Sequence, residues 1–173
     1  DELPADEKNT TIDETFVARA EVPVPKDAAA WKATREELLT ALREKSFRGW
    51  PKQAPESQLK EAFRTTVDGV ELAAYDFTSQ EHVDLRLYVA QRPGLKQADL
   101  VVLNALDGQG WQQFMATYGG KFAKQLSEEA KATGDVEADA KSFDQTKKML
   151  ANFPWVMAYV APRGVGLTIW NQA

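Results

Sequence analysis

Residues 100–111, Leu-Val-Val-Leu-Asn-Ala-Leu-Asp-Gly-Gln-Gly-Trp, constrain the fold of this chain more than any other stretch. The apolar run at 100–103 is too short for a helix and follows a turn at Pro93-Gly94, which predicts a buried strand. Beyond it the large apolar residues switch to helical spacing: Trp111, Phe114, Met115, Tyr118 and Phe122. A strand, a glycine-containing loop and a helix in this order indicate an α/β protein, which usually places its chemistry at such a loop.

Two strands are predicted before this stretch, at residues 70–77 and 83–90, and we expect them to form an antiparallel hairpin. The second strand alternates, and its apolar side should be the buried one: Val83, Leu85, Leu87 and Val89. Further upstream, Asp27 should cap a helix that ends near residue 45. The polar residues 1–15 predict a mobile tail, and the prolines within 16–25 predict an extended linker.

After the central stretch we expect a helix over residues 111–131, interrupted at Gly119-Gly120, and a second helix over 137–151. Residues 155–161 are almost wholly apolar, as in a strand covered on both faces and parallel to the strand at 100. The two carboxyl ends should then meet. The domain prediction is a tail and linker at 1–25, a helix with an aromatic loop at 26–60, and a partial α/β domain at 61–173.

Composition excludes several classes of function. The net charge of −5 gives no basic surface for nucleic acid, and no apolar run is long enough to span a bilayer. With one histidine and no cysteine, no metal or other cofactor site is expected, and the acidic residues near helix ends are interpreted as solvated: Glu128, Glu129, Asp135, Glu137 and Asp139. The start without methionine suggests an exported protein after removal of its signal, although a cloning boundary explains it equally well.

Two further segments carry a resemblance to a known family. Tyr-Asp-Phe-Thr-Ser-Gln-Glu at 75–81, followed by Leu-Arg-Leu-Tyr at 85–88, precedes Ala-Pro-Arg-Gly-Val-Gly at 161–166. This order resembles the first half of α/β-hydrolases of the acetyl-xylan-esterase-like and prolyl-oligopeptidase-like groups, over about residues 60–173. The resemblance implies a partial α/β-hydrolase-like sheet, made of an antiparallel hairpin and two parallel strands with crossover helices.

The resemblance also implies site residues. The loop after the third strand would supply a backbone N–H group to an oxyanion hole, from Leu106, Asp107 or Gly108. The Pro-Arg-Gly loop, with Arg163 and Gly164, would lie near a substrate pocket, or Arg163 would only anchor the loop. The sequence departs from the family in having Leu-Asp where a His-Gly pattern is common.

No catalytic residue is predicted, because the nucleophile elbow Gly-x-Ser-x-Gly is absent and His82 should sit in an exposed turn on the far side of the sheet. The leading hypothesis is therefore an inactive N-terminal half of a hydrolase, either a fragment or one chain of a split enzyme, completed by another chain or segment. The strand at 155–161 is expected to expose the edge that a partner covers. The alternative is a non-catalytic α/β binding or assembly module.

Overall fold

The computed structural model describes residues 4–12, 24–47 and 56–170. The chain divides into two compact units, Asp1–Trp50 and Pro51–Ala173, and each is described by itself. The predicted boundaries at residues 25 and 60 stay predictions. Most of the predicted linker at 16–25 and part of the aromatic loop, including Trp50, lie outside the described residues.

The first unit is helical in its described parts. A short 3-10 helix, η1 (Asn9–Thr11), precedes α2 (Ala28–Ala41), which continues as a π-helical turn, η2 (Leu42–Ser46). Asp27 caps α2 as predicted, because its carboxylate accepts a 2.8 Å hydrogen bond from the N–H of Ala30. The apolar residues of α2 remain exposed within this unit, Trp31 at 54% and Leu38 at 61%.

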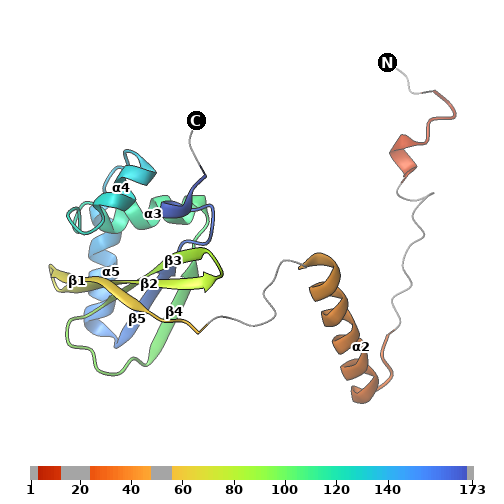
Figure 1. Ribbon diagram of the computed structural model, residues 1–173, viewed down its shortest axis with the longest axis horizontal. Helices are drawn as coiled ribbons and strands as arrows, with labels where there is room; N and C mark the ends of the chain where they lie inside the picture. Colours follow the sequence, from red (N-terminus) through yellow and green to blue (C-terminus); the bar gives the residue numbers. More distant parts are fainter. Residues whose placement is uncertain (1–3, 13–23, 48–55, 171–173) are drawn as a thin grey trace. The chain divides into compact units, whose positions relative to one another are not determined.

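The second unit is a mixed α/β structure around one sheet of five strands (Figure 1). The strands are β1 (Lys60–Val67), β2 (Val70–Gln80), β3 (Val83–Gln91), β4 (Leu100–Ala105) and β5 (Trp155–Val160). Their order in the sheet is β1-β2-β3-β5-β4. All neighbours are antiparallel except β4 and β5, which are parallel. The predicted fold class is thus confirmed, and the arrangement is consistent with a partial α/β-hydrolase-like sheet.

The helices of this unit lie between β4 and β5 in sequence. They are α3 (Gly108–Tyr118), α4 (Ser127–Thr133) and α5 (Ala140–Asn152), and a 3-10 turn, η3 (Gly166–Thr168), follows β5. The break predicted at Gly119-Gly120 is confirmed. A Cβ atom on Gly119 would lie 2.5 Å from the carbonyl oxygen of Met115, so the chain turns at a residue without one. The region predicted as an interrupted helix over 111–131 accordingly forms two helices, α3 and α4, because α3 ends at this crowded turn.

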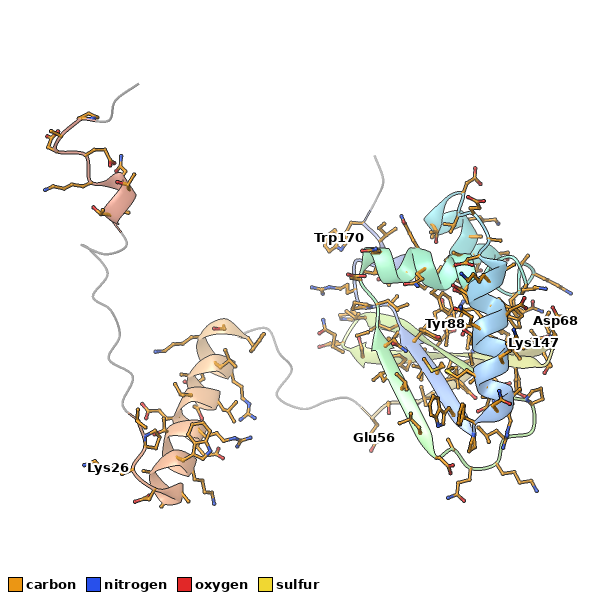
Figure 2. All side chains as sticks on the ribbon, turned by 180° about the vertical axis from the view of Figure 1, so that it is seen from behind. Lys26, Glu56, Asp68, Tyr88, Lys147 and Trp170 are labelled. Carbon is orange, nitrogen blue, oxygen red and sulfur yellow. The ribbon has the colours of Figure 1, made fainter. Side chains whose placement is uncertain are left out.

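All three helices cover the same face of the sheet, which we call the helix face. Figure 2, seen from behind Figure 1, shows α5 in front of the strands. Phe114 of α3 packs against Tyr88 of β3 and Tyr159 of β5, with ring centroids 4.8 and 5.2 Å apart. The core lies here, between strands and helices, and its largest fully buried side chains include Tyr88, Tyr118, Phe122 and Phe143.

The opposite face of the sheet, the helix-free face, is also apolar. The strand register places on it these residues: Ala73, Tyr75 and Phe77 of β2, Leu85, Leu87 and Val89 of β3, Val101, Leu103 and Ala105 of β4, and Val156, Ala158 and Val160 of β5. The prediction that the Leu85 side of β3 is its buried side is wrong. Tyr88 and Ala90, on the other side, face the helices and are 1% and 0% exposed.

The sheet edge also differs from the prediction. Strand β5 pairs on both sides, with β3 and with β4, so residues 155–161 offer no free edge. The free edge on this side belongs to β4, which was predicted to be buried. Leu100, Val101 and Leu103 are 42%, 59% and 65% exposed. Strand β5 is not the edge strand because β3 pairs with its second side. The strand order therefore leaves β4 at the edge of the sheet.

Strand β1 is an element that the sequence interpretation missed. It pairs with β2 through a tight turn at Asp68 and Gly69, whose φ angles are 51° and 85°. An Asp-Gly pair between alternating residues is a strong hairpin signal, because both positions tolerate positive φ. The same strand edge carries charged side chains, which discourage further pairing.

Candidate functional site

The parallel pair β4 and β5 brings two loops together at one edge of the sheet, as the sequence predicts. Ala105 pairs with Val160, and the N–H of Leu106 donates a 2.9 Å hydrogen bond to the carbonyl oxygen of Val160. Across the two loops, Gly166 lies so close to Trp111 that a Cβ atom there would be 3.0 Å from the indole ring. Carboxyl ends of parallel strands are where open α/β sheets bind ligands, so this edge is the candidate site.

The first loop ends in a capped helix. Asp107 is the N-cap of α3, and its carboxylate accepts a 2.7 Å hydrogen bond from the N–H of Gly110. Its carbonyl oxygen accepts from the N–H of Trp111 at 2.9 Å. Asp107 and Gly108 are exposed, whereas Leu106 is 8% exposed. Of the three residues predicted for an oxyanion hole, Leu106 is the one whose N–H is already occupied, because it donates to the carbonyl oxygen of Val160.

The second loop carries the predicted pocket residues. Gly164 adopts φ 89°, and its N–H donates to the hydroxyl of Thr168 over 3.0 Å. That hydroxyl also bonds carbonyl oxygens within the loop, which fixes the turn. Arg163 is exposed and forms no ion pair within the described ranges. Its guanidinium is thus available at the candidate site.

His82 lies in the exposed turn between β2 and β3, as predicted, with 89% of its side chain exposed and only Glu81 nearby at 3.5 Å. The predicted position on the far side of the sheet from a nucleophile stays a prediction, because this chain is not expected to contain the nucleophile. Because β3 runs antiparallel to β5, its start lies at the carboxyl end of β5, beyond the Leu87–Val160 pair. Within residues 56–170 no hydrogen bond joins a serine to His82, and Ser79 and Ser142 bond to Val83 and Asp139 instead. No serine–histidine pair is assembled there.

A cavity of about 720 Å³ lies beside β4 on the helix face. Its wall is mostly uncharged and polar and includes Asn104, Gln113, Thr117, Tyr118, Gln145 and Tyr159. The hydroxyls of Tyr118 and Tyr159 are 3.1 Å apart. Burial raises the pKa of both phenols above the ordinary range, so both remain protonated at neutral pH. This wall offers hydrogen bonds, and its one charged residue is Asp107, whose carboxylate caps α3.

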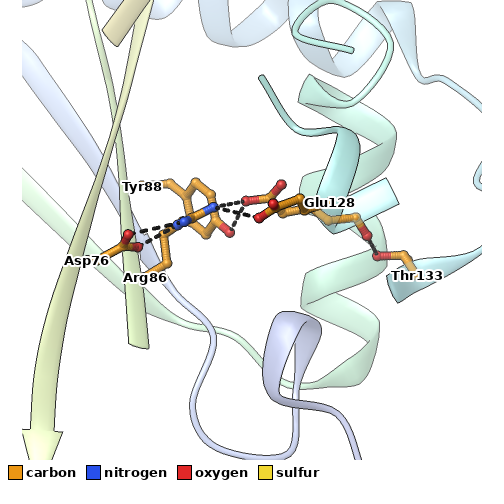
Figure 3. Close-up of polar contacts among 6 residues, drawn as sticks. Asp76, Arg86, Tyr88, Glu128 and Thr133 are labelled. Carbon is orange, nitrogen blue, oxygen red and sulfur yellow. Dashed lines mark hydrogen bonds and ion pairs between the residues drawn. The ribbon is translucent and has the colours of Figure 1, made fainter. Parts of the chain in front are cut away.

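A buried ionic cluster lies under α4, and the sequence interpretation missed it. Glu129 is 0% exposed, and its Oε1 accepts hydrogen bonds from Arg86 at 2.9 Å and from the Tyr88 hydroxyl at 2.8 Å. Arg86 also donates to both carboxylate oxygens of Asp76, at 2.6 and 3.1 Å (Figure 3). The prediction that Glu129 is solvated is therefore wrong.

The electrostatics of this cluster follow from its burial. The hydrogen bond to Asp76 is the largest cause that raises the pKa of Arg86, which stays charged. Burial, reinforced by the charge of Glu129, raises the pKa of Tyr88 far above its ordinary range. The second oxygen of Glu129 has no hydrogen-bond partner among the described residues. The hairpin register could have indicated this cluster, because it pairs Asp76 with Arg86 on the helix face.

In the part of the chain that the structure describes, no group of three or more potential ligands could hold a metal ion. No helix in those ranges is long and apolar enough to cross a bilayer.

Comparisons with known proteins find structural similarity to two solved structures but do not assign the chain to a family. No protein-family model and no curated protein matches this chain. Among solved structures, it is similar to a candidate acetyl xylan esterase from Bacteroides fragilis, with 12% identity and a TM-score of 0.48 over 82% of this chain and 33% of that chain. It is also similar to a CE15 glucuronoyl esterase from Teredinibacter turnerae, with 16% identity and a TM-score of 0.41 over 82% of this chain and 35% of that chain. The chain thus spans about a third of the length of both.

Proposed function

We propose that this chain forms half of an α/β-hydrolase-like domain of the esterase or peptidase type, inactive alone and completed by another chain or segment. The observation that carries the proposal is the open edge of β4. This edge belongs to a parallel pair whose carboxyl ends bear two touching loops. A strand added beside β4 in parallel would end next to Asp107 and Gly108, where a nucleophile elbow could be placed.

The two edges of the sheet support this reading by contrast. On β1, Arg64 forms ion pairs with Glu61 at 2.9 Å and with Glu71 at 2.5 Å. Charges of this kind protect an edge strand from pairing. On β4, Val101 and Leu103 are exposed instead, and none of its six residues is charged. An unprotected apolar edge is favourable only when another strand covers it.

The roles that we propose for this half are structural and electrostatic. The N–H groups of Asp107 and Gly108 are the proposed oxyanion donors, and they would stabilise charge that develops on an acyl oxygen. Arg163 and Gly164 would form the pocket wall, with Arg163 placed to hold an anionic group of a substrate. The nucleophile and its base would come from the completing polypeptide, and no cofactor is required for acyl transfer of this kind.

A non-catalytic assembly module is the second candidate, and the helix-free face favours it. A monomer rarely exposes a large contiguous apolar patch unless another protein binds there. The same surface would serve a structural partner without any reaction at the loops.

The test uses a fluorophosphonate label and p-nitrophenyl acetate hydrolysis, measured on the 173-residue chain and on the completed domain, purified as the intact gene product or with its copurifying chain. We expect no labelling of the 173-residue chain, and labelling of a serine outside it together with ester hydrolysis in the completed domain. The control is the completed domain with that serine changed to alanine. A folded, completed domain that neither labels nor hydrolyses the ester would support the module instead.

A further inference from the structure

The second loop packs against the indole of Trp111, which belongs to α3. A Cβ atom added to Gly166 would lie 3.0 Å from both Cε2 and Cζ2 of that ring, so the glycine backbone already rests on its benzene portion. Trp111 is 4% exposed and is part of the hydrophobic core. The position of this ring therefore limits how closely the second loop can approach the start of α3.

Contacts of two kinds hold the Trp111 ring. Its face stacks on Phe114, with centroids 5.4 Å apart and planes inclined by 21°, and Tyr88 lies beside it with centroids 5.9 Å apart. The one polar atom of the ring, Nε1, donates a 2.8 Å hydrogen bond to the hydroxyl of Thr133 in α4. Because a hydrogen bond is directional, this contact determines which edge of the ring faces α4.

The Thr133 hydroxyl is itself held in one orientation. It donates its only proton to the carbonyl oxygen of Glu129 at 2.6 Å, which leaves a lone pair to accept from the indole (Figure 3). The carboxylate of Glu129 in turn accepts from Arg86 and Tyr88. Hydrogen bonds thus connect β3, through two residues of α4, to the ring that supports the second loop.

We infer that Thr133 is a positioning residue for the second loop. Its hydroxyl orients the Trp111 indole, and the ring sets where Gly166 lies. The N–H of Gly164 donates to Thr168, so the turn that carries Gly164 is tied to the segment that rests on the ring. The consequence for substrate rests on the proposed function, in which Arg163 and Gly164 form the pocket wall.

The chain offers a matched control for this role in Thr117 of α3. Its hydroxyl donates to the carbonyl oxygen of Gln113, four residues earlier, at 2.8 Å. Thr133 makes the same kind of bond to Glu129, also four residues earlier. Of the two hydroxyls, that of Thr133 also accepts an indole N–H. A change that follows from losing the common bond should therefore appear at both positions, whereas a change in the second loop should appear only at Thr133.

The experiment uses nuclear magnetic resonance of the ¹⁵N-labelled 173-residue chain and its variants Thr133→Val, Thr133→Ser and Thr117→Val. Trp111→Phe assigns the indole signal among those of the five tryptophans. In Thr133→Val we expect exchange of the Trp111 indole proton to be about five-fold faster, as for the loss of one neutral hydrogen bond. The amide signals of Gly164 and Gly166 should shift in the same variant. Thr133→Ser keeps the hydroxyl, so it and Thr117→Val should leave the exchange within about two-fold and the glycine signals unmoved.

Three results would overturn the inference. Unmoved signals of Gly164 and Gly166 in Thr133→Val would mean that the loop is positioned without the indole. Equal shifts in Thr117→Val would show a general effect of losing a hydroxyl in a helix, and a serine variant that behaves like valine would assign the effect to the methyl group. These signals are recorded without any reaction, so a completed domain that fails to hydrolyse an ester would count against the proposed function alone.

Discussion

The Tyr88 hydroxyl donates a 2.8 Å hydrogen bond to Oε1 of Glu129, although the two residues are 41 positions apart in the sequence. This bond joins the middle of the sheet to α4, whose seven residues make few other apolar contacts with the strands. Arg86, two residues before Tyr88 on the same face of β3, donates to the same oxygen. The cluster therefore positions α4, and through Thr133 it also positions the Trp111 indole beside the candidate site, since that ring donates to the Thr133 hydroxyl at 2.8 Å.

Replacing Glu129 with leucine should destabilise the second unit strongly, because Arg86 would lose its buried partner. Breaking a buried ion pair typically costs about 3–5 kcal/mol. Because Asp76 remains bonded to Arg86, we expect about 3 kcal/mol in urea unfolding. The double variant Arg86→Met with Glu129→Leu should recover part of this loss, since it leaves no buried unpaired charge and the remaining Asp76 carboxylate is 41% exposed. Additive losses in the double variant would show that the two side chains are not coupled.

Replacing Tyr88 with phenylalanine removes only the hydroxyl that reaches Glu129. A hydrogen bond to a charged group contributes about 1.5–3 kcal/mol, so the urea midpoint should fall by a corresponding amount. Tyr75→Phe is the matched control, because its hydroxyl contacts Arg64 on the exposed side of the same sheet. We expect about 0.5 kcal/mol or less there, as for other exposed contacts. Equal losses at the two positions would contradict a special role for the buried cluster.

Alkaline pH should destabilise the second unit through its buried tyrosines. The pKa values of Tyr88, Tyr118 and Tyr159 are raised in the folded state, chiefly by burial. Above about pH 10 the unfolded chain loses protons that the folded chain keeps, so the unfolding free energy falls as pH rises. Each such tyrosine contributes a slope of up to about 1.4 kcal/mol per pH unit. Urea titrations between about pH 8 and pH 11 measure this slope, and Tyr118→Phe should reduce it. An unchanged slope in that variant would count against burial as the cause.

Local patterns predicted the elements whose signals are contained in a few neighbouring residues. Asp27 caps α2, the chain breaks at Gly119, and His82 occupies an exposed turn. The parallel pairing of β4 and β5 also followed from the sequence, because a crossover connection leaves few alternatives. These features depend on backbone rules that act over short distances or on a strong topological preference.

Features that depend on the packing of elements distant in the sequence were not predictable in the same way. Whether Leu85 or Tyr88 faces the helices depends on which side of the sheet α3 packs, and the charged Asp84 and Arg86 made the Tyr88 side of β3 look solvent-exposed. Glu129 looks like a solvated residue because its neighbour Glu128 is one, with 72% of its side chain exposed. The sequence pattern indicated an exposed edge at residues 155–161 because it gave no sign that they also pair with β3. Strand β3 belongs to an antiparallel hairpin that comes earlier in the chain. Of the candidate site, the two loops were predicted, whereas the hydrogen bond that occupies the Leu106 N–H was not.

Substituting Gly166 with alanine tests the contact between the two loops. This glycine has φ 62°, and a Cβ atom would lie 3.0 Å from the Trp111 ring. Gly94→Ala is the matched control, because Gly94 has φ 71° and nothing within 4 Å of the added atom. Positive φ alone costs about 1–2 kcal/mol, so any larger loss at Gly166 reports the displaced indole. Tryptophan fluorescence should shift in the Gly166 variant and not in the control, and identical behaviour would contradict the close contact.

Placing a lysine at Leu103 should make the 173-residue chain less prone to associate. The side chain is 65% exposed on the open edge strand, so the substitution removes little buried surface and changes the unfolding free energy by about 0.5 kcal/mol or less. Lysine on an edge strand opposes pairing with another edge, because its charge would have to be buried. Light scattering against concentration should therefore show smaller assemblies for Leu103→Lys than for the unmodified chain. Thr66→Lys adds the same charge to the already charged β1 edge and should leave association unchanged, whereas equal effects at both positions would point to net charge and not to the β4 edge.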